Sequence, residues 1–261
     1  MGADRLKRWG RQARPLLIAH RGASTGAPEN TLAAFRLARE QGADGVELDV
    51  MRCGSGEVVV FHDDDLARLG GPGRSARDQV RALPLAALRE VDLGAGERIP
   101  LLDEVFETLG PELLVNIELK TPPDWLDRAR DHGLAKAVAE LVRRHGFEAR
   151  ALISSFDPLL LARFRAAAPS VGTGLLFGAD QSRPFRHAWA APLLRPLALH
   201  PESTLVDQVA LGRWRARGYL VHTWTVDDPA ELRCLAALGV DAVITNRPAE
   251  SRRALDESAG A

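Results

Sequence analysis

Two short apolar segments that each lead to a histidine constrain the fold of this chain more than any other feature. Residues 15–19 precede His20, and residues 57–61 precede His62. Apolar runs of about four to eight residues between turn-forming residues are typical of buried strands. Helical patterns separate most of the other apolar runs, and strands that alternate with helices predict a mainly parallel sheet in an α/β fold.

This alternation continues along most of the chain. Nine segments are predicted as strands: 15–20, 46–51, 57–61, 113–119, 151–156, 172–177, 197–200, 219–226 and 242–245. Six are predicted as outer helices: 32–41, 101–109, 134–145, 158–167, 205–217 and 228–238. A length of 261 residues suits one (β/α)8 TIM barrel, so residues 1–261 are expected to form a single domain.

The connection between the second and third strands departs from that pattern. Residues 52–56 are too few for a helical crossover, which takes about a dozen residues, so a hairpin is expected there. The surplus ninth strand is then either the hairpin arm or residues 197–200. Residues 63–100 contain no strand–helix unit and are interpreted as a small insertion after the third strand. Residues 179–195 are expected to be irregular and to cover the site.

Three carboxylates on neighbouring predicted strands are candidate ligands for a metal ion. Glu47 and Asp49 lie two residues apart on a predicted strand, so they share one face, and Glu118 lies in the next barrel strand. Buried acids need partners, and one divalent cation, Mg²⁺ or Ca²⁺, is the simplest partner for carboxylate oxygens. An ion pair between Glu118 and Lys120 is the alternative, although it leaves Glu47 and Asp49 without a partner.

The two histidines fall at the carboxyl ends of their strands, where the active site of a (β/α)8 barrel lies. Histidine has an unperturbed pKa of about 6.5, so His20 and His62 suit general acid–base cleavage of a phosphodiester. The other histidines lack acidic neighbours at strand ends. His132, His145, His187 and His222 are interpreted as surface or packing residues, and His200 is left open.

Two cationic side chains reach the same end of the barrel. Arg21 follows His20, and Lys120 follows Glu118. Arginine offers a planar fork for two phosphate oxygens and lysine a point charge, so both are candidates for substrate binding, although a salt bridge to a carboxylate is compatible with either. Glu29 either supports one of the site side chains or caps a helix.

The remaining candidates for substrate binding are two aromatic residues and an amide. Phe156 and Trp224 are placed to form an apolar wall, although core packing is the commoner role for aromatic residues in a barrel. Asn246 follows the last strand, where it either binds a substrate hydroxyl or holds the final turn.

Several motifs in order resemble those of the glycerophosphodiester phosphodiesterases. They are H-R-G-A-S, P-E-N-T, E-L-D-V, F-H-D, I-E-L-K, W-T-V and T-N-R-P, spread between Leu16 and Pro248. The resemblance implies a TIM barrel with an insertion after the third strand. It also implies a metal site at Glu47, Asp49 and Glu118. Where the family has R-T-T, this chain has Arg68, Leu69 and Gly70.

The resemblance implies metal-dependent hydrolysis of a glycerophosphodiester to sn-glycerol 3-phosphate and an alcohol. It further implies that the substrate's own glycerol hydroxyl attacks first, through a cyclic phosphate, with His20 and His62 exchanging roles. Two alternatives stay open. One is a lysophospholipase D-type enzyme, with residues 179–189 beside an apolar groove. The other is a phosphate-ligand binding protein without catalysis.

Composition limits the partners and the location. A net charge of −1 gives no indication of a nucleic-acid partner, and no stretch approaches the about 20 apolar residues of a membrane helix. The cysteines, Cys53 and Cys234, are expected to be free thiols, and a cytoplasmic location is expected. The basic residues 1–15 are expected to fray. A small-molecule substrate is expected, and a homodimer is compatible with the sequence.

Overall fold

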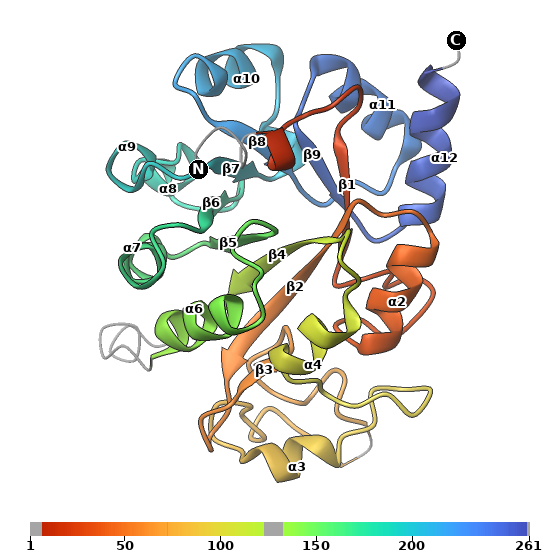
Figure 1. Cartoon of the computed structure of the whole chain (residues 1–261), viewed down its shortest axis with the longest axis vertical. Helices are drawn as coiled ribbons and strands as arrows, with labels where there is room; N and C mark the ends of the chain where they lie inside the picture. The colour runs from red at the N-terminus through yellow and green to blue at the C-terminus, as the bar shows by residue number, and fades with distance from the viewer. Residues whose placement is uncertain (1–6, 72, 123–132, 260–261) are drawn as a thin grey trace.

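The computed structural model describes residues 7–71, 73–122 and 133–259. Its centre is a closed barrel of eight parallel strands with helices around it, which confirms the predicted fold (Figure 1). β1 pairs with both β9 and β2, and these two pairings close the barrel. The barrel strands are β1 (Leu16–His20), β2 (Gly45–Arg52), β4 (Leu114–Leu119), β5 (Ala151–Ser155), β6 (Gly172–Phe177), β7 (Ala198–Pro201), β8 (Leu220–Thr223) and β9 (Ala242–Thr245).

The surplus strand is the hairpin arm. β3 (Val58–Val60) runs antiparallel to β2 and takes no place in the barrel. Residues 197–200, the other candidate, belong to barrel strand β7, which pairs with β6 and β8. The short connection between β2 and β3 explains this arrangement, because it leaves no room for a crossover helix.

The outer helices follow the strands. They are α2 (Leu32–Glu40), α4 (Leu102–Thr108), α6 (Leu134–Arg144), α7 (Pro158–Ala167), α10 (Gln208–Arg215), α11 (Pro229–Leu238) and α12 (Pro248–Ala259). Four of them, α2, α7, α10 and α11, have a side-chain cap at the amino end. Thr31 caps α2, because its side chain accepts a hydrogen bond from the backbone N–H of Ala34. Phe35 and Ala38 face inward and are fully buried.

Three predicted elements differ in detail. Residues 179–195 contain two short helices, α8 (Arg183–Arg186) and α9 (Ala191–Leu194), each of four residues and therefore too short to show a helical period. The predicted helix at 205–217 starts later, because residues 203–205 form a 3₁₀ turn and Asp207 caps α10. The strand predicted to reach Val226 ends at Thr223.

The insertion after β3 lies below the barrel in Figure 1, with α3 (Leu85–Arg89) at its lower edge, and it contributes to a separate apolar cluster. Buried side chains from β2, β3 and the insertion meet there, so the insertion is fixed to the hairpin. They are Met51, Cys53, Val59, Phe61, Leu66, Val80, Leu88, Val91 and Ile99. The assignment of residues 1–261 to one domain stays a prediction.

The amino end of the barrel is closed by residues that were expected to fray. Trp9 is 1% exposed and packs with Leu16, Ile18 and Ala242 at the start of the strands. Its carbonyl oxygen lies 2.9 Å from Nε2 of His222. Fraying is therefore wrong for residues 7–15, because burial of a tryptophan outweighs the loss of chain entropy, whereas residues 1–6 lie outside the described residues. No helix among the described residues is long and apolar enough to cross a membrane.

Candidate active site

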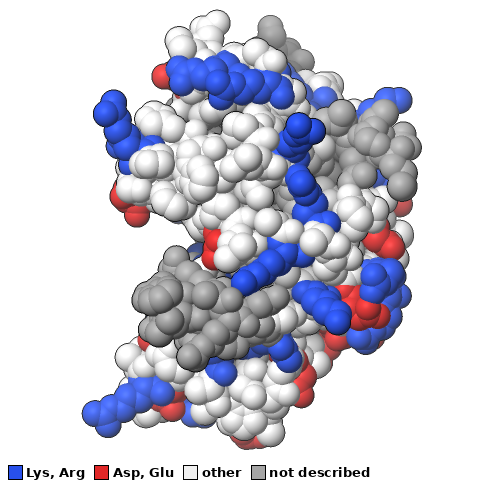
Figure 2. Space-filling model, turned by 90° about the vertical axis from the view of Figure 1, so that its left-hand side faces the viewer, with Lys and Arg blue, Asp and Glu red and all other residues white. Residues whose placement is uncertain are grey.

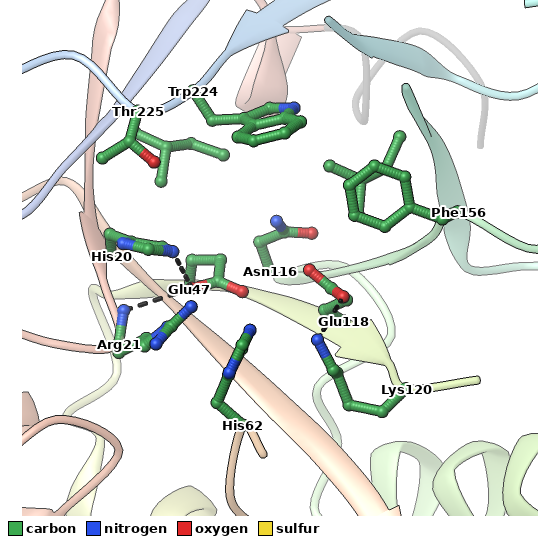
Figure 3. Close-up of a pocket in the computed structure, with 12 residues that line it drawn as sticks. His20, Arg21, Glu47, His62, Asn116, Glu118, Lys120, Phe156, Trp224 and Thr225 are labelled. Carbon is green, nitrogen blue, oxygen red and sulfur yellow. Dashed lines mark hydrogen bonds and ion pairs between the residues drawn. The ribbon is translucent and has the colours of Figure 1, made fainter. Parts of the chain in front are cut away.

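A pocket of about 260 Å³ lies at the carboxyl ends of the barrel strands. Side chains from several strands point into it from different sides (Figure 3). Most of the residues selected from the sequence line it: His20, Arg21, Glu47, His62, Glu118, Lys120, Phe156 and Trp224. The predicted convergence at this end of the barrel is therefore present in the structure.

Three carboxylates form one cluster beside this pocket. Glu47 and Asp49 lie on β2, and Asp49 is paired in register with Glu118 on β4. One oxygen from each of the three lies within 4.8 Å of the others. Glu47 and Asp49 are 4% and 1% exposed. Within the described part of the chain, this is the group of acids whose geometry suits a metal ion.

The pKa shifts of the three acids indicate that too little positive charge lies near Glu47. Burial, with the neighbouring charges of Asp49 and Glu118, raises the pKa of Glu47 well above its ordinary value. Burial also raises the pKa of Glu118, against the opposing effect of Lys120. Asp49 differs, because Lys120 and the other cationic groups around it outweigh burial and lower its pKa. A bound cation would stabilise the charged form of Glu47 and so lower its pKa.

The Glu118–Lys120 ion pair that the sequence offered as an alternative is present, but it leaves Glu47 without a lysine or arginine partner in the described part of the chain. Nζ of Lys120 lies 3.1 Å from Glu118 and 3.5 Å from Asp49. Nε of Arg21 lies 3.3 Å from Asp49. Among the described residues, Glu47 accepts one hydrogen bond, from the backbone N–H of Arg21 at 3.1 Å, and Nε2 of His20 lies 3.9 Å away (Figure 3). Three carboxylates thus face two cationic side chains.

Each candidate catalytic histidine is held through Nδ1. Nδ1 of His20 lies 2.8 Å from Oδ1 of Asn246, and Nδ1 of His62 lies 2.7 Å from Oδ1 of Asp63. The amide of Asn246 is itself oriented, because its Nδ2 donates to Asp227 at 2.7 Å. Both Nδ1 atoms therefore act as donors, and Nε2 of each ring, which makes no hydrogen bond with the described residues, can exchange a proton.

The turn after β1 positions Arg21 in a constrained backbone. Arg21 has φ 56° and Gly22 has φ 82°. A Cβ on Gly22 would lie 2.7 Å from the backbone of Ala34, so only glycine allows the turn to rest on α2. The Arg21 guanidinium donates to Glu29 at 2.8 Å. Burial and then the charge of Arg21 lower the pKa of His20, which keeps its ring neutral near pH 7.

An aromatic pair forms the opposite side of the pocket. Phe156 and Trp224 pack edge to face, with ring centroids 5.6 Å apart. Nε1 of Trp224 donates to the carbonyl of His200 at 2.8 Å, so the indole is fixed against the barrel wall. Both rings contribute to the lining as well as to packing (Figure 3).

Three of the selected residues, Asp49 of the carboxylate cluster, Asn246 and Glu29, do not line the pocket. Asn246 was expected either to bind a substrate hydroxyl or to hold the final turn, and both ends of its amide are engaged by protein groups, with His20 and Ser24 on Oδ1. Glu29 accepts from Arg21, and Thr31 caps the helix, so the supporting alternative for Glu29 agrees with its contacts.

The other described histidines pack or lie at the surface, as predicted. His145 contacts Asp103 at 2.9 Å, His187 is exposed, and His222 is buried against Trp9. His200, left open, is fully buried inside the barrel. His132 lies outside the described residues.

Sequence reasoning missed several residues of the site. Asn116 lines the pocket and lies two residues before Glu118 on the same face of β4, so strand alternation alone was enough to find it. Asp63 was visible in the F-H-D motif but was given no role. Leu176, Thr225 and Ile244 also line the pocket, and no local pattern marks them.

Comparison with known proteins agrees with this geometry. Residues 20–250 match the model of the glycerophosphoryl diester phosphodiesterase family. A glycerophosphodiester phosphodiesterase of Caldanaerobacter subterraneus is 34% identical over 89% of this chain and 94% of that protein. A phosphodiesterase of Oleispira antarctica, solved with the product sn-glycerol 3-phosphate, is 32% identical, with a TM-score of 0.80 over 94% of this chain and 98% of that one.

A third relative is similar to this chain in both sequence and fold. The glycerophosphodiester phosphodiesterase of Thermotoga maritima is 31% identical, with a TM-score of 0.73 over 92% of this chain and 97% of that one. The family match covers residues 20–250, which include strands β2 to β9, the insertion and all the pocket residues. The chain therefore belongs to the glycerophosphoryl diester phosphodiesterase family, a family of phosphoric diester hydrolases.

Proposed function

We propose that this chain hydrolyses glycerophosphodiesters to sn-glycerol 3-phosphate and an alcohol, with His20 and His62 as the acid–base pair and a divalent cation in the site. The observation that carries the proposal is the arrangement of the two rings. Both rings line one pocket and have Nδ1 engaged, so that Nε2 is the nitrogen available for proton transfer, and Glu47, Glu118 and two cationic side chains line the same pocket. The Oleispira relative, which was solved with that product, supports the choice of product class.

Glu47, Asp49 and Glu118 would hold the cation. The fit rests on their oxygen chemistry, their spacing within 4.8 Å and the missing positive charge at Glu47. Mg²⁺ and Ca²⁺ both take carboxylate oxygens. When bound, such an ion neutralises developing charge on phosphoryl oxygens.

The protein's own groups account for substrate binding and proton transfer. Arg21 and Lys120 flank the cluster and suit the non-bridging phosphate oxygens. Trp224 and Phe156 face them across the pocket and suit the glycerol carbons. His20, neutral near pH 7, accepts the proton of the attacking hydroxyl.

His62 then donates a proton to the departing alkoxide, and Asp63 stabilises the protonated ring that this requires. In the order that the family resemblance implies, the glycerol hydroxyl attacks phosphorus and the bond to the alcohol oxygen breaks. Water then opens the cyclic phosphate with the histidine roles reversed. Trapping the cyclic phosphate supports this order, whereas single-step inversion at phosphorus by labelled water contradicts it.

The reaction is tested with glycerophosphocholine and glycerophosphoethanolamine, beside His20→Ala and His62→Ala. The expected result is release of glycerol 3-phosphate that falls by about 10²–10⁴-fold in either variant, the usual contribution of an acid–base group. His187→Ala, at an exposed position, is the matched control. If both active-site variants match the wild type in ligand binding and in every activity, the chain is a binding protein instead.

A lysophospholipid substrate is the second candidate, favoured by exposed aromatic residues beyond β6. Phe185 is 39% and Trp189 48% exposed, and they pack edge to face at 6.0 Å. Figure 2 shows the side of the molecule that carries α7, α8 and α9 as a mainly uncharged surface with Lys and Arg side chains around it. Faster turnover of lysophosphatidylcholine than of glycerophosphocholine, lost in Trp189→Ser, would establish this candidate.

A further inference from the structure

The first turn of the insertion carries an arginine that the proposed reaction does not use. Nε and Nη2 of Arg68 donate to the two oxygens of Asp63 at 2.7 and 3.0 Å. Nη1 and Nη2 donate to the two oxygens of Glu29 at 3.0 and 2.7 Å. One guanidinium therefore engages every carboxylate oxygen of two acids. Its planar fork of donors allows this, and a lysine could not reproduce it.

Each of those acids in turn holds a residue of the site. Oδ1 of Asp63 accepts from Nδ1 of His62 at 2.7 Å, and Oε1 of Glu29 accepts from Arg21 at 2.8 Å. Arg68 thus lies one contact behind a proton-transfer residue and one contact behind a phosphate-binding residue. Arg21 follows β1 and His62 follows β3, and the two carboxylates connect these residues through Arg68.

The backbone around Arg68 is fixed, so the contact is built into the fold. Leu66 is fully buried in the cluster of the insertion, and its N–H donates to the carbonyl of Asp78 at 3.2 Å. The N–H of Gly70 donates to the carbonyl of Leu66 at 2.8 Å. A Cβ on Gly70 would lie 2.4 Å from that carbonyl oxygen, so the turn closes only with glycine there.

Burial distinguishes this network from an ordinary surface ion pair. The Arg68 side chain is 47% exposed, but those of Glu29 and Asp63 are only 18% and 21% exposed. Hydrogen bonds from Arg68 lower the pKa of both acids although burial opposes this, so both remain charged near neutral pH. Exposed ion pairs contribute little to stability, whereas bidentate contacts in a network fix the orientation of the side chains that they join.

We propose that Arg68 is a positioning residue, which orients His62 through Asp63 and Arg21 through Glu29 at the same time. The inference rests on the proposed function for its effect on turnover. It gives the start of the insertion a part in the reaction, since Arg68 comes from the insertion and its two partners contact Arg21 and His62, which line the pocket.

The test compares Arg68→Ala with Arg77→Ala. Arg77 is an exposed arginine of the same insertion, so its replacement makes the same change of charge. Arg68→Ala is expected to lower kcat/KM for glycerophosphocholine by about 10- to 100-fold, the usual effect of removing a group that supports a site residue. Both kcat and the affinity for sn-glycerol 3-phosphate should fall, because a proton-transfer group and a phosphate-binding group lose their support together. Arg68→Lys should be intermediate, and added guanidinium should restore part of the activity of Arg68→Ala only.

A second readout is independent of turnover. Ring ¹⁵N shifts report which nitrogen of His62 carries the proton; they should show Nδ1–H in the wild type and a mixture in Arg68→Ala. If the wild type cleaves no phosphodiester, the proposed function fails, and the ring shifts still decide the positioning role. Unchanged ring shifts, or turnover within about twofold of Arg77→Ala, would overturn the inference. Circular dichroism checks folding, and if Arg68→Ala does not fold, Arg68→Lys decides by the same criteria.

Discussion

Replacing His222 by glutamine is expected to remove part of the pH dependence of stability. His222 is 1% exposed, and Nε2 contacts the carbonyl of Trp9 at the closed end of the barrel. Its ring centroid lies 4.9 Å from that of His200, which is buried as well. Burial lowers the pKa of His222 from 6.5 to about 4. The folded protein therefore keeps this ring neutral at a pH where the unfolded chain protonates it.

The size of the effect follows from that difference. As the pH falls below 6.5, the unfolded chain takes up the proton first, so the free energy of unfolding decreases until about pH 4. One group with these two pKa values accounts for about 3 kcal/mol over the whole range and about 2 kcal/mol between pH 7 and pH 5. Above pH 7 its contribution is constant.

Urea unfolding at pH 7, 6 and 5 measures this directly. His222→Gln is less stable than the wild type at pH 7 because it loses packing, and the informative quantity is its slope. From pH 7 to pH 5, the wild type should lose about 2 kcal/mol more than the variant, and exposed His187→Gln should behave as the wild type. Equal slopes for His222→Gln and the wild type would refute the account of a neutral buried ring.

Three further variants test the site and the turn that supports it. Asn246→Ala should lower kcat by about 10- to 100-fold with a smaller change in KM, because His20 loses the acceptor on Nδ1; an equal change in both would contradict this. Lys120→Met should weaken binding of sn-glycerol 3-phosphate by about 10- to 100-fold in calorimetry, as for a lost charged hydrogen bond, and unaltered binding would exclude Lys120 as a phosphate ligand. Gly22→Ala should lower the free energy of unfolding by about 1–3 kcal/mol in urea, since φ is 82° there and the new Cβ meets α2; a stability equal to the wild type would show that the turn adapts.

The barrel was predictable because its signals are local. Apolar segments such as Leu16–His20 and Ala242–Thr245 are short, continuous and bounded by turn-forming residues. The hairpin was predictable from chain length alone, since residues 52–56 allow no crossover. α8 and α9 were not, because four residues give no period, and their position depends on packing of Ala188, Ala191 and Leu194 against distant helices.

The site residues likewise include some that local sequence patterns predict and some that they do not. Residues at strand ends, such as His62 and Glu118, follow from strand direction and alternation. The roles of Asn246 and Arg68 do not, because each depends on a contact across the fold, with His20 and with Glu29. Trp9 was expected to fray because its neighbours in sequence are mostly basic, and no local pattern indicates that its ring packs at the amino end of the barrel. These roles share one cause: the contacting residues are far apart in the sequence, so no local pattern marks them.

The most direct test of the account is ³¹P NMR of glycerophosphocholine with the chelated protein, then with Mg²⁺, Ca²⁺ or Mn²⁺ restored, beside Glu47→Gln. The account predicts that sn-glycerol 3-phosphate appears only after a metal is restored. It also predicts that Glu47→Gln forms little product, because the carboxylate cluster loses an oxygen ligand. Release of phosphocholine, undiminished turnover in chelator, or no product with any metal would contradict it.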